Sequence, residues 1–257
     1  MIETMMEVKN PFENKDEASR YQSYRPMYHH LPFQRIKEFL NTEITCALDV
    51  ACGTGHSTFA LSKIAEKVIG CDLSKTMLAE ARKNYDLEFI QSPGERLPFE
   101  DSSFDLINIS MGFHWLEQEK FLNEAKRLLK PNGYLNIDSY GFCGVISKID
   151  SEQEAHNALF DQYLPAASRR EGYPTSEILK KTDLSIAKEI LYEHEIEMSQ
   201  DQFINLIKTW SNFQIKDQVN QKITSLKMEE TYSKIFRGES LILGFRGKSL
   251  LLRLTVK

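Results

Sequence analysis

Short apolar runs alternate with helical patterns along the first half of the chain, from Cys46 to about Tyr140. Each run has the length of a buried strand, and turn residues separate it from the helical pattern that follows. Alternation of this kind is typical of strand and crossover-helix units around a parallel sheet. The predicted strands cover residues 46–50, 67–72, 87–91, 104–110 and 134–140. The pattern therefore predicts an α/β fold with a doubly wound, mostly parallel sheet.

Two helices are predicted between these strands. Ser74 is a suitable N-cap for the first, because an apolar stripe follows it over residues 77–81. The second carries apolar residues on one face over residues 121–129, and the sequence Pro-Asn-Gly at 131–133 then ends the helical pattern. Both helices are expected to lie against the sheet.

After Phe142 the pattern changes to polar helices with scattered aromatic residues, over 150–164 and 202–210. Between them, residues 186–198 alternate as a strand does. The tail, 241–256, is rich in apolar and basic residues, and a turn at 244–247 would make it a hairpin. We expect this tail to close the sheet as an antiparallel C-terminal edge.

The length of 257 residues suits one large domain, which we expect in four parts. Residues 1–45 form an N-terminal segment and 46–142 the core. Residues 143–235 form a mostly helical cap with one sheet strand, and 236–257 a C-terminal strand or hairpin.

Composition excludes several classes of protein. Apolar residues make up 41% and charged residues 27%, and no apolar run approaches the roughly 18 residues of a membrane span. The net charge of −5 disfavours a nucleic-acid-binding protein. The N-terminus lacks the basic and apolar blocks of an export signal, so a cytoplasmic location is expected. The histidines and cysteines show no ligand spacing, so no metal is expected.

A glycine-rich turn follows the first predicted strand, in the sequence ALDVACGTGH. Gly53 and Gly55 leave room for a ligand to approach the backbone, and they stand where a strand gives way to a helix. Turn geometry alone also explains a pair of glycines. Asp49 and Ala51 lie just before them, so an acidic group is expected at the end of the strand.

Asp72 ends the second strand in the sequence VIGCD, about 20 residues after the glycines, where a carboxylate can accept both hydroxyls of a ribose. The alternative is an aspartate at the start of a helix. A nicotinamide cofactor would use the same two features. However, Thr58 replaces the third glycine of the dinucleotide pattern, and no second mononucleotide half follows.

Four segments in order, DVACGTG, VIGCDLS, ERLPFEDSSFDLINISMGFHW and EAKRLLKPNGYL, resemble the successive motifs of class I S-adenosylmethionine-dependent methyltransferases. They span about residues 47–135, and YQSYRPMY, HW and KTWSNF are similar to the trans-aconitate methyltransferase-like subgroup. The resemblance implies a Rossmann-like fold, S-adenosylmethionine as cofactor and a small-molecule acceptor.

The resemblance also assigns roles to individual residues. Asp49, Ala51, Gly53 and Gly55 would line the methionine and ribose side, Asp72 would hold the ribose, Leu73 and Gly94 with Glu95 would border the adenine, and Ser110 would face the methionine portion. The chain departs from the family at Ala51, where glycine is commoner, and at Pro93, where a polar residue often meets the adenine amine.

The N-terminal segment and the HW pair are candidates for the reacting end. In the resembled subgroup this segment folds over the cofactor, so Tyr21 and Arg25 would contact it and Tyr24 the substrate; the alternative is an amphipathic helix ended by proline. His114, beside Trp115, could take a proton from an alcohol or amine, or hydrogen-bond a carboxylate that needs no base. A packed loop histidine is the alternative.

The cap offers weaker candidates. Trp210 fits either a helix core or a substrate platform, and Arg169 with Arg170 fits either a solvated pair or a site for an acidic substrate. We expect a methyltransferase that acts on a small molecule, through oxygen more than nitrogen or carbon. A nicotinamide-dependent oxidoreductase and a catalytically silent cofactor-binding protein remain the rival hypotheses.

Overall fold

The computed structural model describes residues 12–145, 150–165 and 171–254. These residues build one sheet of seven strands in the order β3-β2-β1-β4-β5-β7-β6. The strands are β1 Ile44–Val50, β2 Ala65–Asp72, β3 Glu88–Gln91, β4 Phe104–Ser110, β5 Leu129–Val145, β6 Leu184–Met198 and β7 Leu241–Leu254. The first five are mutually parallel, and β7 runs antiparallel to both β5 and β6. This confirms the predicted mostly parallel sheet with an antiparallel C-terminal strand. The edge of the sheet on that side is β6, because β7 lies between β5 and β6.

Helices cover both faces of the sheet because its strands alternate apolar side chains between the faces. Leu48 and Ile107 pack with α5 (Gln118–Leu128) on one face. Ala47 and Leu106 pack with α2 (His30–Leu40) and α3 (His56–Leu61) on the other. α4 (Lys75–Asn84), which begins after Ser74 as predicted, packs on Phe89 of β3.

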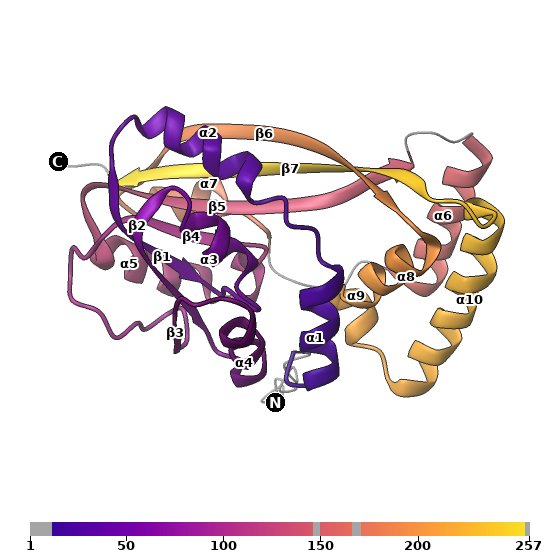
Figure 1. The fold of residues 1–257 in the computed structure, drawn as a ribbon. Helices are drawn as coiled ribbons and strands as arrows, with labels where there is room; N and C mark the ends of the chain where they lie inside the picture. Colours follow the sequence, from indigo (N-terminus) through magenta and orange to yellow (C-terminus); the bar gives the residue numbers. More distant parts are fainter. Residues whose placement is uncertain (1–11, 146–149, 166–170, 255–257) are drawn as a thin grey trace, which may run out of the picture.

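The second half of the chain builds a helical cap. Its helices are α6 Asp150–Tyr163, α7 Ser176–Lys180, α8 Gln200–Lys208, α9 Ser211–Gln214 and α10 Gln218–Phe236. Figure 1 shows β5, β6 and β7 continuing past the other strands to reach α6, α8 and α10. A second apolar cluster, which includes Phe203, Tyr232 and Phe245, joins these helices to the long strands. α1 (Lys15–Tyr24) stands between the cap and the rest of the sheet (Figure 1).

The prediction of a turn at residues 244–247 is wrong, because β7 is continuous from Leu241 to Leu254. The glycine at position 247 is explained by a neighbouring side chain. It lies opposite Tyr192 of β6, and a Cβ at this position would come within 2.1 Å of the tyrosine ring. The glycine therefore gives the Tyr192 side chain room to cross β7.

Within the described residues, no helix is both long and apolar enough to cross a membrane.

Candidate active site

A cavity of about 740 Å³ lies between the sheet, α1 and the cap. Most of the predicted site residues line it. From the predicted cofactor set these are Tyr21, Arg25, Ala51, Gly53, Asp72, Leu73, Gly94, Glu95 and Ser110, and from the predicted substrate set His114, Trp115 and Trp210. Side chains that are far apart in the sequence therefore share one space, with the ends of the parallel strands at one side and the cap at the other.

The glycine-rich turn lines the end of the cavity that lies beside the parallel strands, which we call the first end; the second end lies beside the cap. Gly53 has a φ of 55° and Ala51 a φ of 52°, so both adopt the left-handed conformation that glycine tolerates best. Only a flexible methionine methyl, at 3.6 Å, stands near the space that a Cβ of Gly53 would take. The backbone here is accessible to a ligand. The left-handed conformation also explains why glycine is favoured at position 51, where this chain carries alanine.

Asp72 is held in a fixed orientation at the end of β2. One carboxylate oxygen accepts the amide of Gly53 at 2.9 Å, and the other accepts the amide of Ser74 at 2.8 Å. Burial raises the pKa of the carboxyl, and these hydrogen bonds oppose the rise. Each oxygen keeps further capacity to accept a hydrogen bond, so the carboxylate can bind a vicinal diol in the cavity.

Asp49 does not line the cavity and lies beneath the turn. It is fully buried, and it accepts hydrogen bonds from Ser57 at 2.7 Å, Thr58 at 2.6 Å and Asn108 at 2.7 Å. Burial raises the pKa of this carboxyl to about 6. The geometry points to support of the turn rather than to direct ligand contact. Thr58, where the dinucleotide pattern has glycine, is one of its donors.

Two further predicted residues stand apart from the cavity lining. Gly55 is the N-cap of α3 with a φ of 86°, and a Cβ there would approach the Phe89 and Tyr85 rings to 3.0 Å. Its glycine is explained by helix geometry and packing. Tyr24 lines a separate surface pocket beside His194. The structure therefore leaves Gly55 and Tyr24 out of the main cavity lining, although Arg25 lines both pockets.

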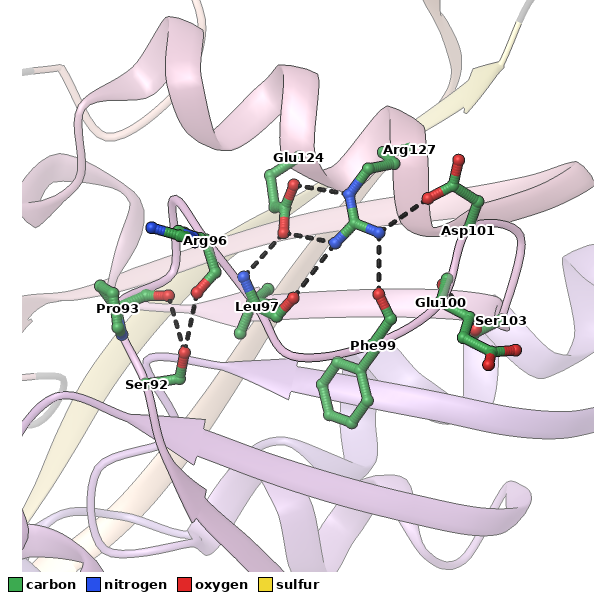
Figure 2. Close-up of polar contacts among 10 residues, drawn as sticks. All are labelled: Ser92, Pro93, Arg96, Leu97, Phe99, Glu100, Asp101, Ser103, Glu124 and Arg127. Atoms are coloured by element: carbon green, nitrogen blue, oxygen red, sulfur yellow. Dashed lines mark hydrogen bonds and ion pairs between the residues drawn. The ribbon is translucent and has the colours of Figure 1, made fainter.

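The loop that carries Gly94 and Glu95 is fixed by α5 (Figure 2). Arg127 donates to the carbonyl of Phe99 at 2.8 Å and to that of Leu97 at 3.1 Å. Glu124 holds Arg127 and also accepts the amide of Leu97 at 2.7 Å. This pair is not among the residues predicted from the sequence, although its i, i+3 spacing on a helix is typical of an ion pair.

α1 and the residues before it cover the cavity's first end. The Phe12 ring makes edge contacts with Tyr21 and Trp115, each at 5.9 Å between ring centroids. Ser74 donates to the Phe12 carbonyl at 2.8 Å. Arg25 follows α1, stacks over Tyr21 at 4.8 Å and donates from Nε to Thr209 at 2.8 Å. The N-terminal segment is thus tied to the sheet and to the cap.

A short 3₁₀ helix, Phe113–Trp115, follows β4 and presents the predicted reacting pair. His114 is 8% exposed and its ring lies 5.1 Å from that of Trp115. Ser110 ends β4 and accepts from Asn108 at 3.2 Å. These side chains meet the cavity where its two ends join, at the carboxyl edge of the sheet, where open α/β sheets bind ligands.

The second end of the cavity is lined by aromatic rings that the sequence analysis did not assign to the site. They come from β5, α6, the N-cap of α9 and β7, and are Tyr140, Phe142, His156, Phe160, Trp210 and Phe245. Of these, only Trp210 was a candidate, and it lines the cavity while also packing on the cap core. Arg169 and Arg170 lie outside the described residues.

Known proteins resemble this chain in sequence and in fold. Residues 48–137 match the family model described as a methyltransferase domain. A Dictyostelium discoideum protein named as a methyltransferase is 27% identical over 231 residues, covering 86% of this chain and 84% of the relative. Demethylmenaquinone methyltransferase of Chlorobaculum tepidum is 43% identical over 89 residues, covering 34% of this chain and 37% of the relative.

A solved structure from Anaeromyxobacter dehalogenans, described as a type II methyltransferase, superposes with a TM-score of 0.71 at 18% identity. It covers 91% of this chain and 100% of that one.

Residues 48–137 therefore match a methyltransferase domain, and the chain has the Rossmann-like fold, which supports a class I methyltransferase with S-adenosylmethionine as methyl donor. Nothing in the comparisons favours the nicotinamide-dependent oxidoreductase. They also do not specify the trans-aconitate methyltransferase-like subgroup. Among the described residues, no group of three or more histidine, cysteine or acidic side chains is placed to hold a metal ion.

Proposed function

We propose that this enzyme methylates an oxygen of a small molecule, a hydroxyl or a carboxylate, bound at the cap end of the cavity. The observation that carries the proposal is a single cavity of about 740 Å³ with two different ends. Asp72 and Gly53 lie at one end, and Phe160 and Trp210 at the other. The volume is typical of small-molecule sites, and one continuous space lets donor and acceptor meet.

The residues at the first end fit S-adenosylmethionine. Asp72 is oriented by two backbone amides and can take the ribose hydroxyls. Leu73 is 59% exposed although it is apolar, which suits a side chain that packs on a purine. Arg25 keeps N–H donors beyond those used on Thr209 and is proposed to pair with the carboxylate of the cofactor.

The cofactor, when bound, would supply a sulfonium methyl group, whose carbon an acceptor oxygen would attack in line while S-adenosylhomocysteine departs. The protein contributes position and exclusion of water. Phe12, Tyr21 and Trp115 are proposed to close the cofactor end, since all three line the cavity and the Phe12 ring contacts the other two. His114 is proposed to take the proton of a hydroxyl acceptor, or to hydrogen-bond a carboxylate acceptor.

The test is release of S-adenosylhomocysteine from S-adenosylmethionine in the presence of candidate acceptors, with the methylated product identified by mass spectrometry. An O-methyl product formed by the wild type and greatly reduced in Asp72→Ala supports the proposal. Asp86→Ala is the matched control, because Asp86 is exposed and lies outside the cavity lining. An N-methyl or C-methyl product would overturn the O-methyl assignment. Tight cofactor binding without turnover on any acceptor would favour a silent cofactor-binding protein.

A further inference from the structure

The rings at the cap end of the cavity form a connected wall, which we term the aromatic band. Its members are Tyr140, Phe142, His156, Phe160, Trp210 and Phe245. Ring centroids are 4.9 Å apart for Phe142 and His156, 4.4 Å for His156 and Phe160, and 5.5 Å for Phe160 and Trp210. These spacings are those of stacked and tilted aromatic pairs, so a planar ligand can continue the same packing.

His156 is the member of the aromatic band with a directed polar group. Its Nδ1 lies 3.0 Å from the hydroxyl of Tyr232 on α10. Burial lowers the pKa of His156 to about 4, so the ring is neutral at pH 7. Among the described residues, no hydrogen bond to Nε2 is formed. His156 lines the cavity, so Nε2 is the ring nitrogen left to meet a ligand there.

The tautomer of His156 follows from Tyr232. That tyrosine is 1% exposed, and His156 is its hydrogen-bond partner among the described residues. If the tyrosine donates to Nδ1, its hydrogen is satisfied and Nε2 carries the ring's own hydrogen. The opposite tautomer leaves a buried hydroxyl hydrogen without an acceptor. Tyr232 thus makes Nε2 of His156 a hydrogen-bond donor toward the cavity.

Asn212 also lines the cavity and carries a side-chain carbonyl oxygen, which is a hydrogen-bond acceptor. Its Nδ2 donates to the carbonyl of Leu164 at 2.8 Å, which fixes the orientation of the amide. Its Oδ1 has no partner among the described residues and is sealed from solvent, so it reaches a ligand only when the side chain shifts. A ligand hydroxyl can accept from an N–H and donate to such an oxygen, whereas a carboxylate can only accept.

We propose that the methyl acceptor is a planar aromatic compound bearing a hydroxyl group, and that His156 determines this specificity by donating a hydrogen bond to the ligand oxygen. The inference rests on the proposed function of the cavity and narrows its acceptor to one class. The ring of the acceptor lies against the aromatic band, and Tyr232 is a positioning residue that acts through His156. Among the described lining residues the one cationic side chain is Arg25, which we assign to the carboxylate of the cofactor, so a polycarboxylate acceptor has no second cation to pair with.

Calorimetry on the protein saturated with S-adenosylhomocysteine tests the proposal with four probes. Naphthol carries the ring and the hydroxyl, naphthalene lacks the oxygen, naphthoate replaces the hydroxyl by a carboxylate, and trans-aconitate is an aliphatic tricarboxylate. We expect naphthol to bind about tenfold or more tightly than each of the others. Equal affinity for naphthol and naphthalene, or tighter binding of trans-aconitate, would overturn the proposal.

Variants assign the preference to His156. His156→Phe keeps a ring in the aromatic band and removes the donor, so naphthol and naphthalene should then bind equally. His156→Gln restores an N–H and should recover part of the preference. Tyr232→Phe frees the tautomer and should reduce it. His30→Phe is the control, because His30 is exposed and lies outside the cavity lining.

Thermal unfolding of each variant separates a lost contact from a lost fold, and S-adenosylhomocysteine affinity reports the integrity of the other end. If His156→Phe folds, binds S-adenosylhomocysteine normally and still prefers naphthol, the role of His156 is wrong. Methylation of an aliphatic carboxylate that is insensitive to His156→Phe would refute this inference and leave O-methylation standing. If the protein prefers naphthol through His156 but transfers methyl to no oxygen, the role of His156 stands and the proposed O-methylation is wrong.

Discussion

Each end of the cavity is tied to a buried aspartate: Asp49 lies beneath the glycine-rich turn, and Tyr28, a partner of Asp138, packs on Tyr140 of the aromatic band. The two aspartates differ in where their partners come from. Asp49 accepts from Ser57, Thr58 and Asn108, which belong to the adjoining helix and strand. Asp138 accepts from Tyr28 at 2.9 Å, Tyr192 at 2.7 Å and Ser249 at 2.8 Å. Those three residues come from the N-terminal segment, β6 and β7. The cofactor end is therefore a local assembly, and the acceptor end depends on the whole chain.

The two ends also differ in what forms their walls. At the cofactor end, backbone conformation and backbone hydrogen bonds set the shape, as Gly53 and Asp72 illustrate. At the acceptor end, side-chain rings set it. Removing a single polar group at the first end should therefore weaken cofactor binding by a fixed amount. At the second end, the effect of a substitution should depend on which acceptor is bound.

The largest expected effect is at the junction of the two ends. His114→Ala should lower kcat by about 10²–10⁴-fold with a hydroxyl acceptor, because the proton loses its base. The S-adenosylhomocysteine affinity, measured by calorimetry, should be unchanged. Exposed His30 provides the control His30→Ala. Unchanged kcat in His114→Ala would show that this histidine is a structural residue of the loop.

The aspartate beneath the acceptor end should make folding stability depend on pH. Burial raises the pKa of Asp138 to about 6, against about 3.9 for an unfolded aspartate. The folded protein then binds more protons between these values, so this contribution to stability is full below about pH 4 and is lost as pH rises through about 6. The free-energy difference between wild type and Asp138→Asn should shift by up to about 3 kcal/mol over this range.

Urea unfolding at several pH values measures this shift, and S-adenosylhomocysteine affinity should not follow it. Asp49→Asn is the counterpart at the cofactor end, since burial raises the pKa of Asp49 to about 6 as well. A free-energy difference between wild type and Asp138→Asn that is constant with pH would mean that Asp138 titrates normally in the folded state.

Loss of the ribose contact should have an intermediate effect. Asp72→Ala should weaken S-adenosylhomocysteine binding by about 1–3 kcal/mol, because charged hydrogen bonds to the ribose are lost. The pKa of Asp72 is raised, so wild-type affinity should fall with decreasing pH sooner than for an ordinary aspartate. Calorimetry across pH checks both effects. Asp72→Ala with wild-type affinity would refute the ribose assignment.

The smallest effect concerns the turn itself. Ala51 has a φ of 52°, where a Cβ is strained, so Ala51→Gly should raise the unfolding free energy by up to about 1 kcal/mol. The gain is reduced by the greater chain entropy of glycine in the unfolded state. Denaturant unfolding gives the value. A clear loss of stability would show that the Ala51 methyl makes contacts worth more than its strain.

The same contrast explains which parts of the fold and of the site the sequence alone predicts. The parallel strands and the Asp72 position follow from local patterns, because short apolar runs and a turn specify them within a few residues. The sequence alone does not decide the role of Asp49, because an acidic residue at a strand end fits both a ligand contact and support of the turn. Its bonds to Ser57 and Asn108, which favour support, appear only in the structure.

The acceptor end leaves no comparable signal in the sequence. His156 and Phe160 are spaced as one face of a helix, which is also the spacing of ordinary core residues. α10, which carries Tyr232, buries Met228 and exposes Val219 and Leu226, so apolar residues lie on several of its faces and its periodicity is weak. Contacts between residues 142 and 245 depend on the sheet order, which local patterns do not encode.

A crystal structure with bound S-adenosylhomocysteine tests most directly the claim that one cavity has a cofactor end and an acceptor end. The account predicts the ribose hydroxyls on the carboxylate of Asp72, the sulfur near Ser110 and His114, and space remaining against Phe160 and Trp210. A ligand lying in the opposite direction, with its adenine against Phe160 and Trp210, or bound outside this cavity, would contradict it.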